Sequence, residues 1–69
     1  MLGEAHREVL AALRRLPPRQ RESVVLRYYL DMTEEQAAQA MGVSRGTVKS
    51  ATSRGITALA RLLKEEDAP

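Results

Sequence analysis

The chain of 69 residues has no cysteine and only one histidine, His6. The absence of cysteine excludes a disulfide, a thiolate ligand and a thiol nucleophile, and it fits a reducing compartment such as the cytoplasm. A metal site needs roughly three or four converging ligands, and one histidine with scattered carboxylates does not supply them. We therefore expect neither a metal nor another cofactor.

Glycine-rich loops and long apolar runs are also missing. The four glycines are scattered, so there is no phosphate-binding loop. No apolar run approaches about 18 residues, and the first residues are charged where a signal peptide would be apolar. We expect a soluble cytoplasmic protein that has no membrane segment, binds no small-molecule substrate and is not an enzyme.

What the chain does contain is apolar residues at helical spacing. Hydrophobic residues make up 43% of the sequence, which is enough for a small helical core. Pro17 and Pro18 separate the first two helices, because proline cannot continue the hydrogen-bond ladder but is tolerated in a first turn. No strand pattern occurs. The sequence predicts one all-α domain over 1–69, with four helices at about 4–15, 18–30, 34–41 and 45–64.

The most informative segment spans residues 33–55. Thr33 and Gln36 form a capping-box pattern that starts a helix, and Gly42 suits the left-handed position that ends it. Ser44 then caps another helix. Helix, glycine-containing turn and helix is the helix-turn-helix signature, whose second helix usually enters the DNA major groove.

The second helix of this motif, predicted at about 45–64, is basic. Residues 44–64 include five basic side chains and no acid. A helical wheel places one arc on the core side: Val48, Ala51, Thr52, Gly55, Ile56, Leu59, Leu62 and Leu63. The opposite arc is polar and mostly short: Gly46, Lys49, Ser50, Ser53, Arg54 and Thr57. Such an arc also occurs on solvated faces of ordinary core helices, but the cap, the turn and Gly46 favour DNA binding.

Four motifs occur in order along the chain, in register with one family pattern and without insertions: LPPRQRE from Leu16, LRYY from Leu26, MTEEQAA from Met32 and MGVSRGTVKS from Met41. Together they resemble region 4 of a sigma-70-family factor, most closely the extracytoplasmic-function type, over about residues 16–62. The resemblance implies a four-helix domain that reads the minus-35 promoter element. It also implies docking on the flap of bacterial RNA polymerase, and it names an anti-sigma factor as a further candidate partner.

The chain departs from this family pattern after Ser50. The family commonly continues KSRLSRA, whereas this chain reads KSATSRG. Ala51 lacks an arginine often found there, and Thr52 replaces an apolar core residue. Gly55 replaces an alanine, at a cost of roughly 1 kcal/mol unless it permits close helix packing. The promoter preference of relatives therefore does not transfer. Region 2, which reads the minus-10 element, is absent, so we expect the chain alone to bind DNA without initiating transcription, whether it is an excised domain or a stand-alone regulator.

The expected DNA contacts lie mainly on the basic helix. Arginine and lysine commonly read guanine in the major groove, whereas residues at a helix start are suited to phosphates. Expected base contacts come from Lys49, Ser50, Ser53 and Arg54. Expected phosphate contacts come from Arg45, Thr47 and, upstream, Arg27, which could equally pair with Glu22 or Asp31.

The helix predicted at about 18–30 has more apolar residues than one core face needs. We expect Val25, Leu26 and Tyr29 to face the core. Val24 and Tyr28 then become candidate anchors for a protein partner, although packing within the domain would explain them too.

Two other interpretations remain open. One is a LuxR-type helix-turn-helix output domain, although the LPPRQR and SRGTVKS runs fit a sigma factor better. The other is a sigma-like mimic that binds an anti-sigma factor and not DNA. The retention of Arg45, Lys49 and Arg54 argues against a mimic.

Overall fold

The computed structural model describes residues 3–67, and this range is built from helices without a strand. The elements are α1 (Glu4–Arg14), α2 (Pro18–Val24), the short π-helix η1 (Val25–Tyr29), α3 (Glu34–Met41) and α4 (Arg45–Asp67). The all-α prediction and the four-helix order are confirmed.

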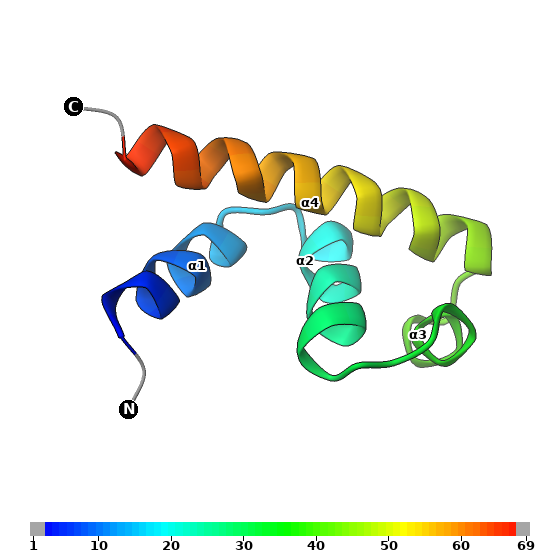
Figure 1. The fold of residues 1–69 in the computed structure, drawn as a ribbon. Helices are drawn as coiled ribbons and strands as arrows, with labels where there is room; N and C mark the ends of the chain where they lie inside the picture. Colours follow the sequence, from blue (N-terminus) through cyan, green and yellow to red (C-terminus); the bar gives the residue numbers. More distant parts are fainter. Residues whose placement is uncertain (1–2, 68–69) are drawn as a thin grey trace.

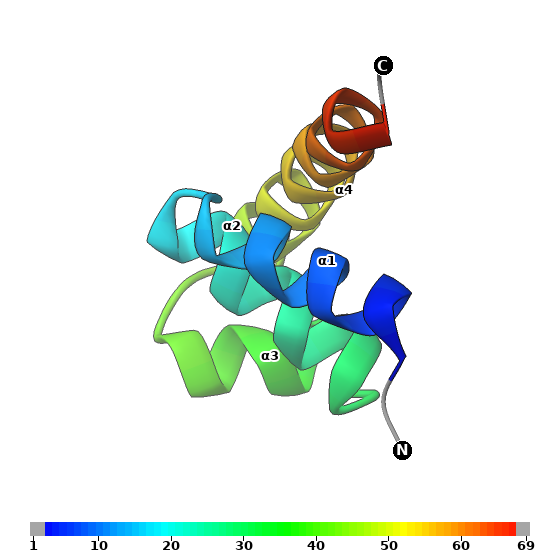
Figure 2. The same cartoon turned by 90° about the vertical axis from the view of Figure 1, so that its left-hand side faces the viewer.

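The long helix α4 runs along the whole molecule. Figure 1 shows α3 beside its first turns, α2 crossing its middle and α1 along its C-terminal half. Both Figure 1 and Figure 2 place α1, α2 and α3 on the same side of α4. The opposite side of α4 is therefore left uncovered along the described part of the chain.

The core consists of two clusters arranged along α4. The first cluster has Leu13, Leu16 and Val24 at its centre, flanked by Val9, Leu10, Val25, Ala58, Leu59 and Leu62. The second cluster has Ala37, Ala38 and Val48 at its centre, flanked by Leu26, Met32, Met41 and Val43. The segment α2–η1 contributes to both clusters, so it connects the helix-turn-helix to the rest of the core.

The helix predicted at about 18–30 differs from its predicted form after Val24. From Val25 onward the backbone is π-helical, and the Leu30 amide donates to the Val25 carbonyl at 3.1 Å. The wider turn breaks the 3.6-residue period from which the core face and the exposed face of this helix were predicted. Val25 and Leu26 pack against the core as expected, but the prediction for Tyr29 is wrong because its side chain is 45% exposed.

The prediction that Val24 is a surface anchor is also wrong. Val24 is 1% exposed and belongs to the first cluster. Here α2 crosses α4 at Gly55, where a Cβ atom would lie only 2.7 Å from Val24 Cγ2. The glycine thus permits the close packing considered above, and this packing buries Val24. Ile56, which follows Gly55, was expected in the core but is 38% exposed.

The helix ends differ slightly from the predicted ones. Helix α1 ends at Arg14, one residue early, and α4 continues to Asp67. Residues 65–67, which lie beyond the predicted helix end at about 64, are therefore helical, and residues 68–69 lie outside the described residues. Within residues 3–67 no helix has the length and apolarity needed to span a bilayer.

Candidate nucleic-acid interface

Both ends of α3 are closed by the residues that the sequence indicates. The Gln36 amide donates to Thr33 Oγ1 at 3.1 Å, and the Thr33 amide donates to Gln36 Oε1 at 2.9 Å. At the other end Gly42 has φ 69°, and the Val43 amide donates to the Ala38 carbonyl at 3.0 Å. This is the Schellman arrangement, in which a left-handed glycine turns the chain sharply out of the helix.

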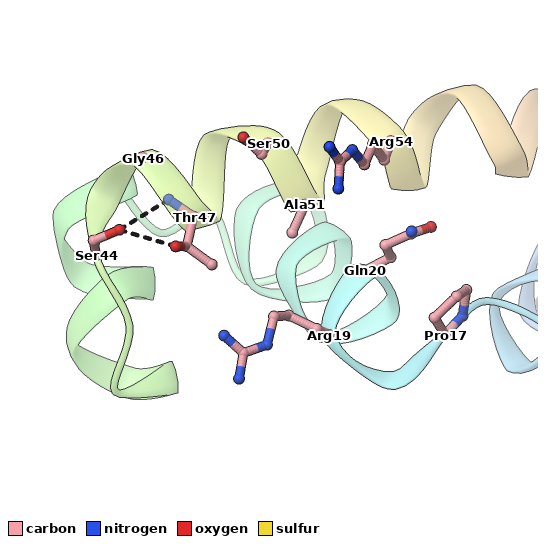
Figure 3. Close-up of a pocket in the computed structure, with 9 residues that line it drawn as sticks. All are labelled: Pro17, Arg19, Gln20, Ser44, Gly46, Thr47, Ser50, Ala51 and Arg54. Atoms are coloured by element: carbon pink, nitrogen blue, oxygen red, sulfur yellow. Dashed lines mark hydrogen bonds between the residues drawn. The ribbon is translucent and has the colours of Figure 1, made fainter.

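Helix α4 starts at a hydroxyl cap. The Thr47 amide donates to Ser44 Oγ at 3.1 Å, and the two hydroxyl oxygens lie 2.9 Å apart (Figure 3). Just before the cap, Val43 packs into the second cluster beside Val48. The cap and this apolar contact together set the direction of α4 relative to α3, completing the predicted helix-turn-helix.

The side chains predicted to read bases are exposed on α4. Small residues at helical spacing run along the middle of the exposed arc: Gly46, Ser50, Ser53 and Thr57. Lys49 and Arg54 stand on its two edges, about 140° apart around the axis at about 100° per residue. A duplex can therefore approach the helix backbone closely between two cationic edges.

On the Arg54 edge, α2 and α4 enclose a hollow of about 630 Å³, which we call the Arg54 hollow. Figure 3 shows its walls, formed by α2 with the preceding proline on one side and the first turns of α4 on the other. The lining residues are Pro17, Arg19, Gln20, Ser44, Gly46, Thr47, Ser50, Ala51 and Arg54.

Arg19 was not singled out from the sequence. It lies 35 positions before Arg54 (54 − 19 = 35), and only the crossing of α2 over α4 brings the two residues to one hollow. No local sequence pattern indicates the position of Arg19, because the other wall of the hollow belongs to a helix distant in the sequence.

The opposite edge of α4 borders a shallower hollow of about 370 Å³, which we call the Lys49 hollow. Its lining combines the end of α2–η1, the start of α3 and the exposed edge of α4: Arg27, Tyr28, Glu34, Lys49, Thr52, Ser53, Ile56 and Thr57. Arg27 is half-buried and donates to the Met32 carbonyl, not to Glu22 or Asp31. The structure thus brings Arg27 together with Lys49 and Ser53. Arg45 is exposed on the first turn of α4 and lines neither hollow.

Thr52 forms a hydrogen bond to the buried hydroxyl of Ser23, which explains why a polar residue lies at this position. Ser23 is fully buried, and its hydroxyl donates to the Val48 carbonyl at 3.1 Å. The single Ser23 proton is thereby used, so the Thr52 hydroxyl must be the donor in its own hydrogen bond to Ser23. Thr52 therefore satisfies a buried polar residue of α2.

Residues 6–59 match the family described as sigma-70, region 4. The RNA polymerase sigma-E factor of Streptomyces antibioticus is 47% identical over 57 residues, which cover 83% of this chain and 30% of that protein. The sigma-E factor of Streptomyces coelicolor gives the same identity and coverage. The ECF RNA polymerase sigma factor BldN of Streptomyces coelicolor is 38% identical over 58 residues, or 84% of this chain and 22% of that protein.

The chain thus spans less than a third of the length of these relatives. No solved structure matches it significantly. The family match covers most of the helical region, including α3, the turn and α4 as far as residue 59. The chain belongs to the sigma-70 region 4 family, and its relatives place it with the extracytoplasmic-function type.

Proposed function

We propose that this domain binds the minus-35 promoter element as part of a bacterial sigma factor, and so directs RNA polymerase to promoters. The observation that carries this proposal is the uncovered arc of α4, with small residues between Lys49 and Arg54. An α-helix about 10–12 Å across fits the major groove, which is about 12 Å wide. The family membership supports the same role, because the relatives are RNA polymerase sigma factors.

In this proposal base reading and phosphate binding fall to different side chains. Base edges are read from the exposed arc by Lys49, Ser50, Ser53 and Arg54. Phosphates are bound from the flanks by Arg45, Thr47 and Arg27, to which we add Arg19 because it lines the Arg54 hollow. Contacts of the second kind position a protein on the duplex without reading its sequence.

The proposed protein partners are the flap of RNA polymerase and an anti-sigma factor. Val24 is buried and contributes nothing to such a contact. Large apolar side chains are exposed at the end of η1, where Tyr29 is 45% and Leu30 58% exposed. Tyr28 is 65% exposed, as a protein contact requires, but its neighbours belong to the face that we assign to DNA.

The test is selection of duplexes from a random pool by the full chain, followed by binding of the selected site to variants. Lys49→Ala should weaken binding by roughly 1–3 kcal/mol and relax the preference at one base pair, because it removes a base contact. Lys64→Ala is the matched control, since it removes the same charge from an exposed position on the same helix, about 22 Å along the axis at about 1.5 Å per residue.

Different outcomes separate the remaining interpretations. Equal losses on selected and scrambled duplexes would reduce Lys49 to a phosphate contact. Failure of the folded chain to select any duplex, with retained binding to an anti-sigma factor, would favour the mimic. The family membership leaves the LuxR-type interpretation without support.

A further inference from the structure

Tyr28 occupies an unexpected place. It lies near the end of η1 and is the most exposed of the large hydrophobic side chains in the described residues, at 65%. The sequence suggested a contact with a protein. In the structure Tyr28 instead lines the Lys49 hollow, together with Ser53 and Ile56 of the recognition helix.

The lining of this hollow carries a net positive charge. Two cations, Arg27 and Lys49, face one acid, Glu34, which leaves a charge of +1 (2 − 1 = 1). The hydroxyls of two lining threonines are engaged within the protein, because Thr52 bonds to the buried Ser23 and Thr57 donates to the Ser53 carbonyl at 3.0 Å. The exposed donors that remain for an outside acceptor include the Lys49 ammonium and the Tyr28 phenol.

The position of the hollow identifies its occupant. When a helix lies in the major groove, a sugar–phosphate backbone runs along each of its edges. The Lys49 hollow borders one edge of α4, so one strand of a bound duplex passes over it. Tyrosine hydroxyls are among the donors that bind phosphate oxygens. An apolar partner surface would instead bury the exposed Lys49 ammonium beside Tyr28 without supplying an acceptor, which is costly.

We propose that Tyr28 is a DNA contact whose hydroxyl donates to a backbone phosphate on the Lys49 side of the recognition helix. The exposed Ile56 side chain lies in the same hollow and covers the adjoining sugar. This inference rests on the proposed DNA binding of the domain. It assigns to the duplex a residue that the sequence pattern assigned to a protein.

The decisive variant is Tyr28→Phe in the full chain, because it removes the hydroxyl and keeps the ring. Binding to the selected duplex and to a scrambled duplex should weaken equally, by about tenfold or more, as expected for one hydrogen bond to a charged acceptor. The salt dependence should keep its slope, since a neutral donor releases no counterion. Tyr28→Ala should lose more affinity, because it also removes the ring.

Tyr29→Phe is the matched control. Tyr29 is the next residue and is also exposed, but its ring faces His6 of α1 with centroids 6.3 Å apart, outside the Lys49 hollow. Its duplex affinity should equal that of the wild type. Lys49→Ala serves as the positive control, and circular dichroism of every variant checks that the fold is retained.

Several results would overturn the inference. If Tyr28→Phe and Tyr28→Ala bind duplex like the wild type while Lys49→Ala binds weakly, Tyr28 does not contact DNA, and the proposed function stands without it. Weakened binding of a polymerase flap helix at unchanged duplex affinity would assign Tyr28 to a protein partner. Altered preference at one base pair would make it a base reader. A folded wild-type chain that binds no duplex would remove both proposals.

Discussion

Gly55 illustrates how one residue sets the spacing between two helices. A Cβ atom there would lie 2.7 Å from Val24 Cγ2 and 3.2 Å from the Gln20 carbonyl oxygen. Alanine normally favours a helix over glycine by about 1 kcal/mol, but forcing atoms into a packed core costs about 1–3 kcal/mol. Val24 is buried and the Gln20 oxygen belongs to the backbone, so neither moves freely. We predict that Gly55→Ala lowers the free energy of unfolding by up to about 2 kcal/mol net, measured by urea denaturation.

Gly46 provides the matched comparison within the same helix. The nearest atom to a Cβ at this position is Ser44 Oγ at 3.9 Å. Gly46→Ala should therefore raise stability by up to about 1 kcal/mol, through helix propensity alone. Equal stabilisation by both substitutions would show that α2 is free to move away from α4 at Gly55.

At the scale of the element, α3 depends on its capping box. It has only eight residues, and isolated helices of this length are marginal in water. Thr33→Ala removes the acceptor for the Gln36 amide and should lower the free energy of unfolding by about 1 kcal/mol. Because α3 carries Ala37 and Ala38 of the second cluster, the loss should appear in global denaturation and not only in local fraying.

Thr33→Ser tests the mechanism of this loss. Serine retains the hydroxyl acceptor, so the stability should remain within about 0.5 kcal/mol of the wild type. A loss as large as that of the alanine variant would attribute the effect to the threonine methyl group instead of the cap.

At the scale of the whole molecule, shape and charge distribution both favour a long polar contact. The radius of gyration is 12.5 Å, compared with about 11 Å for a compact domain of this length. The reason is α4, whose 23 residues make a helix about 34 Å long at about 1.5 Å per residue along the 40 Å dimension. The net charge is only +2, but α4 carries no acidic residue between residues 45 and 64. A duplex bound as we propose would therefore meet a locally cationic edge on a protein of nearly balanced charge.

This distribution predicts the salt dependence of binding. If Arg19, Arg27 and Arg45 each neutralise one phosphate, the logarithmic slope is about −2.7, which corresponds to roughly a 40-fold loss between about 50 and 200 mM salt. Arg45→Ala should make the slope shallower by about 1, as measured by fluorescence anisotropy at several salt concentrations. Arg7→Ala removes the same charge from an exposed position on α1 and should leave the slope unchanged. An unchanged slope in Arg45→Ala would remove that residue from the phosphate contacts.

The features that the sequence alone determined are local ones. The capping box of Thr33 and Gln36, the left-handed Gly42 and the Ser44 cap depend on groups at most a few residues apart. Their hydrogen bonds can be deduced from residue type and spacing. The exposure of Lys49 and Arg54 followed from the helical period, which α4 keeps throughout this region.

Only the tertiary structure decided where the helices cross and which side chains meet there. The π-helical turn after Val24 shifted the faces of Tyr28 and Tyr29, and the contact between Val24 and Gly55 buried a residue expected on the surface. The same crossing brought Arg19 to the Arg54 hollow. These relations join residues about 30 positions or more apart, or arise where the period breaks, so spacing along the chain cannot specify them. They depend on how closely two helix surfaces can pack, which is a property of both surfaces together.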